Sequence, residues 1–468
     1  MNPSRSLWGP IRHGPYVITV FLVCTLIIVP YASAVHPRVR RAQDQDDTLE
    51  VPVAEAAVPT DSVVVRAVEI PEERVTYEGA QVWRVVATEE QTEFVEYLQE
   101  TGEISMWSGN HTALDVLVHP DAIPRVSRFL RDRRVKFDVV IPDLQRAIDT
   151  ENPIPSPEEM EELAGRKGHR MEWSSYHRLE DIHGYLDYLA QTFPDLCSVM
   201  SIGNSVEGRP LKVLRISNGK PDAPALWIDG GIHAREWISP ASVTYIINHL
   251  VENSEEIEAD YYILPVVNPD GYEYTFRGDR LWRKNRSSPE KGGVCIGADL
   301  NRNFGYRWGG QGSSKQPCRE TFGGSGPFSE PETKAIENFF QTSAANFKAY
   351  LTFHSYGQYI LYPWGYDRKV PPDYADLERV GRQAAAAMKA AGGAASVYTV
   401  GNSATTLYAA SGGSDDWAKA IPKIKYTYTI ELRDRGRNGF VLPAHYIIPT
   451  AKEALAAVKV ITEACKTA

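Results

Sequence analysis

The chain has 468 residues, of which 43% are hydrophobic and 24% charged, and its formal net charge at pH 7 is −10. This composition excludes a mostly disordered chain, a collagen-like fibre and a multi-span membrane protein. The acidic balance argues against a broad nucleic-acid-binding surface, so we expect no nucleic-acid partner. Five cysteines are too few for a miniprotein that disulfides hold together.

The first 34 residues have the pattern of a secretory signal peptide. Arg5 and Arg12 precede an apolar run from Val17 to Val29, and small residues at alternate positions end at Ala34. We expect cleavage after Ala34, because this order of basic, apolar and small residues is typical of such signals. The run is shorter than the ~20 residues of a spanning helix, which favours a secreted protein over a membrane-anchored one.

Residues 35–75 are expected to form a flexible segment. The stretch from Gln43 to Ser62 is acidic, contains proline and has few large apolar residues. The basic cluster Arg38–Arg41 is either a processing site or a solvated surface tetrad.

Residues 76–150 show the order βαββαβ, which predicts a small α+β, ferredoxin-like unit. The unit carries no evident catalytic cluster. We expect strands at Gln81–Ala87, Glu103–Trp107, Ala113–Val118 and Lys136–Ile141, and helices at Glu89–Thr101 and Asp121–Arg133.

Residues 151–172 form a predicted linker. It opens with a proline-rich stretch, and Gly165–Arg170 is basic and contains two glycines, which favours proteolytic cutting there. From 173 to 468, strands and helices alternate, which predicts one α/β domain with a large mixed, mostly parallel sheet flanked by helices. The clearest strands are Leu211–Ile216, Ala225–Asp229, Tyr261–Val267, Phe347–Phe353 and Lys425–Glu431, and the clearest helices Pro240–Val251, Glu330–Gln341 and Ala375–Ala391.

Three polar side chains near predicted strand ends suggest a metal site. His233 and Glu236 follow the strand Ala225–Asp229 and a glycine turn, and on the first turn of a helix both can face one ion. His354 ends another apolar strand. Two His and one Glu leave one position of a tetrahedral zinc open, which is the catalytic pattern. Taken singly, each of these residues fits a structural role as well.

A carboxylate and several arginines complete the candidate chemistry. Glu431 ends another buried strand and is a candidate general base, although pairing with Arg433 would be a structural role. Arg283 and Arg302 suggest a substrate with a free carboxylate, because arginine binds carboxylates through two parallel hydrogen bonds.

In the stretch from about Ser174 to Thr462, the chain resembles the secreted zinc carboxypeptidases of the pancreatic A/B type. The unit before it resembles, in pattern, the inhibitory prodomain of that family. The motifs that carry the resemblance occur in the family's order and are His233-Ala-Arg-Glu-Trp-Ile, Asn268-Pro-Asp-Gly-Tyr, Leu281-Trp-Arg-Lys, Asn301-Arg-Asn, Phe353-His-Ser-Tyr-Gly, Ser411-Gly-Gly-Ser-Asp-Asp-Trp and Glu431-Leu-Arg-Asp.

The resemblance implies a role for each matching position. One zinc ion per chain would be held by His233, Glu236 and His354. Glu431 would act as general base and then acid, and Arg283 would stabilise the oxyanion. The substrate-binding residues would be Asn301 and Arg302 at the terminal carboxylate, Tyr408 closing over it, and Arg235 further back.

The resemblance also places Asp415 at the floor of the pocket for the terminal side chain. A buried acid there favours C-terminal Lys or Arg, as in the B-type enzymes, because a basic side chain relieves the cost of an unpaired carboxylate. Ser403 and Gly365 are small and would leave room. In the alternative interpretation, Ser414 caps a helix and Asp415 and Asp416 complement its dipole.

Four cysteines remain after signal removal. Cys295 and Cys318 match a disulfide of the family. Cys197 and Cys465 either pair or remain free, and their even number in a secreted chain favours pairing. Asn110 and Asn285 lie in glycosylation sequences.

These features together predict the secreted zymogen of a monomeric zinc carboxypeptidase that takes C-terminal Lys or Arg. Its partners would be peptide or protein C-termini, an activating protease and its own prodomain as inhibitor, with no membrane contact after signal removal. One alternative is an A-type enzyme for apolar termini, with Asp415 turned away from the pocket. Another is a non-catalytic peptide-binding relative, against which the presence of Glu431 argues.

Overall fold

The computed structural model describes residues 74–468 except 110–112, 166–167 and 290–291. The expected signal peptide, the cluster Arg38–Arg41, nearly all of the 35–75 segment and Asn110 lie outside the described residues. Among the described helices, none combines the length and the apolar character that crossing a membrane requires.

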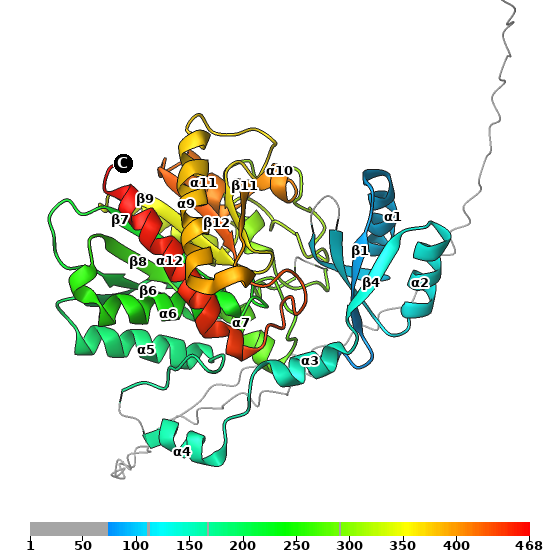
Figure 1. Cartoon of the computed structure of the whole chain (residues 1–468), viewed down its shortest axis with the longest axis horizontal. Coiled ribbons are helices and arrows are strands. Elements are labelled where there is room, and N and C mark those ends of the chain that lie inside the picture. Colours follow the sequence, from blue (N-terminus) through cyan, green and yellow to red (C-terminus); the bar gives the residue numbers. More distant parts are fainter. Residues whose placement is uncertain (1–73, 110–112, 166–167, 290–291) are drawn as a thin grey trace, which may run out of the picture. The chain divides into compact units, whose positions relative to one another are not determined.

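The first described unit is an antiparallel sheet with two helices, as expected (Figure 1). Its strands run in the spatial order β2-β3-β1-β4, and its core includes Trp83, Val95, Val116 and Leu130. The helix α1 follows a capping box in which Thr88 and Gln91 bond each other's backbone. The elements are β1 (Gln81–Val86), α1 (Glu89–Glu100), β2 (Ile104–Gly109), β3 (Ala113–Val118), α2 (Ile123–Asp132) and β4 (Lys136–Ile141).

Two helices that the sequence analysis did not predict follow this unit, α3 (Leu144–Glu151) and α4 (Pro157–Gly165). Asp143 caps α3 by accepting a hydrogen bond from the backbone of Arg146 at 3.0 Å. Pro157 begins α4, where its missing N–H costs nothing. The proline-rich stretch, from which only a linker was predicted, therefore also begins the helix α4.

The second unit contains an eight-stranded sheet in the order β11-β10-β12-β9-β7-β8-β6-β5. In this described sheet, four of the seven strand pairs are parallel, which confirms the expected mixed, mostly parallel sheet. The strands are β5 (Cys197–Asn204), β6 (Pro210–Ile216), β7 (Ala225–Asp229), β8 (Asp260–Leu264), β9 (Phe347–His354), β10 (Tyr359–Tyr362), β11 (Thr399–Asn402) and β12 (Tyr426–Glu431).

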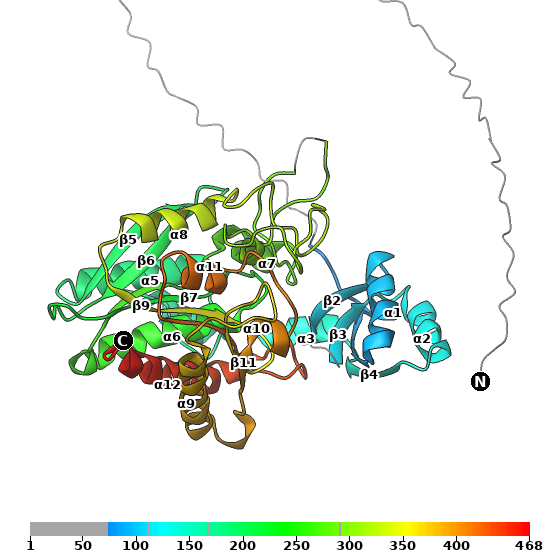
Figure 2. The same ribbon diagram turned by 90° about the horizontal axis from the view of Figure 1, so that it is seen from above.

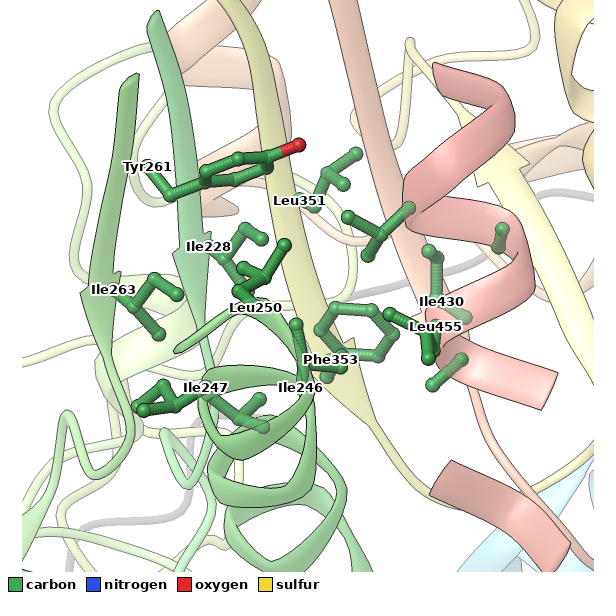
Figure 3. Close-up of a cluster of buried hydrophobic side chains, with 14 of the residues drawn as sticks. Ile228, Ile246, Ile247, Leu250, Tyr261, Ile263, Leu351, Phe353, Ile430 and Leu455 are labelled. Carbon is green, nitrogen blue, oxygen red and sulfur yellow. The ribbon is translucent and has the colours of Figure 1, made fainter. Parts of the chain in front are cut away.

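Helices cover both faces of this sheet (Figure 2). Successive residues of β7 alternate between the faces: Leu226 and Ile228 join the larger core, and Trp227 joins the smaller one. Residues of α5 (Leu179–Thr192), α6 (Ile238–Glu252), α9 (Tyr374–Gly392) and α12 (Ile447–Cys465) pack in the larger core, part of which Figure 3 shows. Residues of α8 (Pro331–Thr342) and α11 (Ser414–Ala420) pack in the smaller one, and the remaining helices are α7 (Pro269–Arg277) and α10 (Ser403–Thr406).

The favoured pairing of Cys197 with Cys465 is wrong. Both thiols are free and buried in the larger core, where they pack as small apolar side chains. Burial raises the pKa of Cys197 to about 11 and that of Cys465 to about 12. Cys295 and Cys318, in contrast, form a disulfide.

Candidate metal centre and peptide cleft

The site lies where the carboxyl ends of the parallel strands β7, β9 and β12 meet. His354 ends β9 and is in register with Glu431, which ends β12. After β7, the chain turns at Gly230 and Gly231 towards His233. Gly231 has φ +62°, and a Cβ there would lie 2.9 Å from Pro240, so this turn requires glycine.

His233, Glu236 and His354 converge on one point, and their ligand atoms lie within 4.8 Å of one another. The Nδ1 atom of His233 lies 2.8 Å from Oε1 of Glu236, and the Nδ1 atom of His354 lies 3.1 Å from Oε2. All three side chains are buried. His233 and Glu236 share a turn that precedes α6, so their expected place on a first helical turn is wrong, although the turn also brings them together.

The outer nitrogens of both histidines have partners, which leaves the inner nitrogens for a ligand. The Nε2 atom of His233 lies 3.1 Å from Oδ1 of Asp299, and the Nε2 atom of His354 lies 3.2 Å from the hydroxyl of Thr352. Such outer contacts fix ring orientation at metal sites. Two imidazoles and a carboxylate aimed at one point are a donor set that fits zinc.

Asp299 is a functional residue that the sequence analysis did not place in the site. One of its oxygens contacts His233, and the other accepts hydrogen bonds from Arg283 at 2.8 and 3.1 Å. Burial alone would raise the pKa of Asp299, but the charges of Arg283 and His233 hold it well below its ordinary value. Asp299 therefore connects the metal centre to the arginine beside it.

Glu431 lines the same cavity as the three converging side chains. Burial raises the pKa of this carboxyl to about 8, and the neighbouring charge of His354 acts in the opposite direction. A carboxyl group that titrates near neutral pH can both accept and return a proton. A bound cation would lower this pKa by charge attraction.

The cavity also brings together the polar residues expected to bind substrate. Arg283, Asn301, Arg302 and Tyr408 line it together with Glu431. Arg302 is held by its own hydrogen bonds to the backbone oxygens of residues 301 and 312. Tyr408 is 47% exposed, so its ring is free to move.

Arg235 does not line this cavity. It lines the adjoining one, where its guanidinium stacks over Phe440 at 4.3 Å. Arg235 is nevertheless buried. The structure therefore places Arg235 in the adjoining cavity and not in the one that the three converging side chains line.

Asp415 lines the same cavity. This carboxyl group is buried, and burial raises its pKa. The small residues Gly365 and Ser403 also line the cavity. Asp416 points elsewhere and accepts backbone hydrogen bonds from Gly365 and Tyr366 at 2.8 and 2.9 Å.

The alternative interpretation of this segment is only partly correct. Asp415 and Asp416 do lie in the first turn of α11, but Ser414 is the first helical residue rather than the cap. The N-cap is Gly413, which has no side chain to cap the helix, and the backbone N–H of Ser414 donates instead to Oδ1 of Asn301 at 2.9 Å.

Residues 74–152 contact the rim of this cleft. Trp107 lines the cavity and its ring centroid lies 5.1 Å from that of Phe440. Asp115 accepts a hydrogen bond from the hydroxyl of Tyr356 at 2.9 Å. Arg84, which is paired with Asp115, also donates to the backbone oxygen of Arg435 at 2.7 Å.

A second contact is a buried ion pair between Glu151, at the end of α3, and Arg280. Two hydrogen bonds join them, the second at 2.8 Å, and both side chains are at most 2% exposed. Arg280 also donates to the backbone oxygens of Arg235 and Phe440. The guanidinium of Arg280 therefore connects α3 to the two segments of the cleft wall that contain Arg235 and Phe440.

The disulfide between Cys295 and Cys318 closes the loop that contains Asn301 and Arg302. Asn285, which lies in a glycosylation sequence, has a fully buried side chain, and this burial argues against a glycan there. Its Nδ2 atom donates to Glu330 at 2.7 Å and to Glu332 at 3.1 Å. The sequence pattern alone could not reveal this burial.

Comparison with known proteins identifies two families along the chain. Residues 182–457 match the family model of zinc carboxypeptidases, and residues 83–151 match that of carboxypeptidase activation peptides. Among curated proteins, the chain is 48% identical over 303 residues to carboxypeptidase B of Astacus astacus, a match that covers 63% of this chain and 99% of the relative. It is 41% identical over 374 residues to carboxypeptidase A4 of Mus musculus, which covers 77% and 87%.

Solved structures give the same result. Thrombin-activatable fibrinolysis inhibitor is 35% identical, with a TM-score of 0.75 and coverage of 84% of this chain and 100% of the other. Carboxypeptidase A from Helicoverpa armigera is 32% identical, with a TM-score of 0.76 and coverage of 85% and 99%. Relatives of both the A and the B type are therefore similar to this chain.

Proposed function

Because the chain belongs to the zinc carboxypeptidase family and carries an activation peptide, we propose that it is the secreted precursor of an enzyme that removes C-terminal Lys or Arg. The protein is a zinc-dependent metallocarboxypeptidase with one zinc ion per chain, made as a zymogen. The preference for basic termini, secretion and the role of each residue are our proposals. The observation that carries the proposal is the buried Asp415 in the lining of the cavity that also contains the three converging side chains.

In this proposal, His233, Glu236 and His354 hold the zinc ion. The convergence of their ligand atoms and the outer contacts of both histidines support this assignment. Bound zinc polarises the scissile carbonyl and makes water more acidic.

Glu431 takes the proton from the attacking water and later gives it to the leaving amine. Its position in the cavity that the three converging side chains line suits both steps. Arg283 donates hydrogen bonds to the oxygen on which negative charge develops, and Asp299 holds the guanidinium in place. Asn301 and Arg302 bind the terminal carboxylate, Tyr408 closes over it, and Arg235 contacts the peptide further back.

Asp415 sets the preference for the terminal side chain. A buried carboxylate without a cationic partner is costly, and a Lys or Arg side chain that enters the pocket supplies that partner. The space beside Gly365 and Ser403 suits a long side chain. The mature enzyme would therefore select basic termini by charge.

The activation region would inhibit the enzyme by covering the cleft. Trp107 and Ser108 line the same cavity as the zinc ligands, in the place where a substrate peptide would have to enter. A cut by an activating protease near Gly165–Arg170 would permit this region to leave. The chain would act as a monomer.

The test is hydrolysis of blocked dipeptides that end in Arg, Lys, Phe or Leu. Purified zymogen is assayed before and after limited trypsin treatment, with and without a zinc chelator. We expect chelator-sensitive release of Arg and Lys after trypsin only. Release of Phe or Leu instead is the result that the A-type alternative predicts. It would support a carboxypeptidase activity but would reject the assignment of Asp415 as the specificity residue. Absence of any release from zinc-loaded, cleaved protein would favour a non-catalytic binding protein.

A further inference from the structure

A row of positive charge lies on the activation region, although the chain as a whole has a net charge of −10. Within residues 125–136, six side chains are cationic and all six are exposed: Arg125, Arg128, Arg131, Arg133, Arg134 and Lys136. We call these six residues the basic row. They belong to α2, to the turn that follows it and to the first residue of β4.

Helix stability does not explain the basic row. Cations stabilise the last turn of a helix, but in α2 only Arg131 lies there. Arg125 lies near the positive end of the helix dipole, where acidic residues are favoured, and the first turn of α2 contains none. The stability of α2 therefore does not account for these cations, which leaves an interaction with another molecule as their explanation.

Most of the row is not neutralised by the protein. Arg125 pairs with Glu103 at 2.8 Å. Among the described residues, no carboxylate forms a salt bridge with the other five cations. The guanidinium of Arg133 stacks on the ring of Phe129 at 3.5 Å, which fixes its position without compensating its charge. The row is thus a dense set of cations that is open to solvent.

The arrangement is linear. Arg125, Arg128 and Arg131 follow one another at three-residue spacing, which places neighbours about 5–6 Å apart on one side of a helix. Arg133 and Arg134 follow in the turn after α2, and Lys136 is the first residue of β4. Within the described residues, no hydrogen bond or ion pair joins the row to any residue after 171.

We propose that the basic row binds a linear sulfated polysaccharide through the sulfate groups. A regular row of exposed cations suits a chain of closely spaced anions, which releases counterions when it binds. A membrane is less suitable, because the apolar residues Val126 and Leu130 of α2 are buried and leave no apolar face to insert. Single-stranded nucleic acid would need open aromatic faces, and Arg133 covers that of Phe129.

The basic row lies in the activation region, and this position decides which form of the protein would bind the polysaccharide. The row precedes the expected cut near Gly165–Arg170, so it stays with the activation region when the enzyme is released. A sulfated polysaccharide would therefore hold the zymogen and not the mature enzyme. This inference goes beyond the proposed function, since it concerns binding by a region without catalytic residues.

The test measures the affinity of the purified full-length zymogen for heparin. The charge-reversal variant is Arg128→Glu with Arg131→Glu. The matched control is Arg379→Glu with Arg382→Glu on α9, which makes the same change in net charge. Both control arginines are exposed but already pair with Asp376 and Glu378. Thermal unfolding and the activity gained after trypsin check that each protein is folded, and Arg128→Gln with Arg131→Gln serves if the first variant is not.

We expect heparin binding to weaken about tenfold or more in the row variant and to remain near the wild-type value in the control. The binding should fall as salt rises and should be absent from the trypsin-released enzyme. Equal weakening in the two variants would overturn the proposal, as would equally tight binding to desulfated heparin. Tighter binding to single-stranded DNA or to phosphatidylserine vesicles than to heparin would also overturn it.

Discussion

At the scale of single residues, a substitution of Glu431 tests the proton transfer separately from the binding of zinc. The substitution Glu431→Gln keeps the size of the side chain but removes the proton acceptor. We expect the variant to fold and bind zinc, because Glu431 is not among the three converging ligands. Turnover should fall at least about 100-fold, since general bases contribute that much or more. Zinc content by atomic absorption and kcat on an Arg-ending dipeptide check both parts, and near-normal kcat would contradict the mechanism.

Asp415 allows a prediction about specificity. In Asp415→Asn the pocket loses its charge but not its shape. We expect kcat/KM for Arg-ending and Lys-ending dipeptides to fall about 30-fold or more, because removing one partner of a buried charge pair costs about 2 kcal/mol or more. Activity on Leu-ending dipeptides should fall far less.

The matched control for this prediction is Asp416→Asn. Asp416 bonds the backbone of the pocket wall rather than the pocket interior, so its loss should affect basic and apolar substrates alike. If both variants changed the ratio of basic to apolar activity equally, Asp415 would not be the specificity residue.

Residues that act through a distant partner mark the limit of what this sequence could predict. The converging His233, Glu236 and His354 were predicted, because each follows a strand whose carboxyl end lies at one sheet edge. Asp299 was not placed in the site, since its role depends on His233, which lies 66 positions earlier in the chain. The burial of Asn285 was equally invisible, because an Asn-x-Ser sequence says nothing about the carboxylates that surround it.

At the scale of elements, the strands predicted from the sequence are those whose burial pattern is local. The central strands β7 and β9 are almost entirely buried, as expected for a parallel sheet with both faces covered. The strands β5, β10 and β11 were not among those predicted. The helix α3 was missed because it is only eight residues long, and α4 because its segment contains several prolines. The free thiols of Cys197 and Cys465 show that an even number of cysteines does not establish pairing.

The start of α5 permits a prediction about pH. His177 lies 3.6 Å from Asp181 and 3.4 Å from Glu172. Burial alone would lower the pKa of His177, but the two carboxylates raise it to about 9. The folded pKa is above the unfolded one, so the stabilisation is complete below about pH 6.5 and is lost as pH rises through 9.

Thermal unfolding of the wild type and of His177→Gln between pH 6 and 10 measures this contribution. The difference in Tm between the two proteins should be largest near pH 6 and should shrink towards pH 10. A difference that stayed constant across this range would show that the charge of His177 does not contribute, since only the protonated imidazole attracts the two carboxylates.

At the scale of the whole molecule, the contacts of residues 74–152 with the rest of the chain suggest that cutting and activation are separate events. Glu151 and Asp115 lie before the expected cut, and their partners Arg280 and Tyr356 lie after it, so both contacts are non-covalent links across the cut. A cut near Gly165–Arg170 therefore breaks neither of them. We expect activity to appear later than cleavage, at the rate at which the activation region dissociates.

The substitution Glu151→Gln tests this separation. It leaves the buried guanidinium of Arg280 without its carboxylate, and loss of one partner of a buried pair is strongly destabilising. The cut variant should therefore gain activity sooner than the cut wild type. Gel electrophoresis and dipeptide hydrolysis on the same samples give the delay between cleavage and activity, and Glu158→Gln on the exposed start of α4 is the matched control. An unchanged delay in Glu151→Gln would mean that other contacts, such as that of Trp107 with Phe440, control the dissociation of the activation region from the cleft.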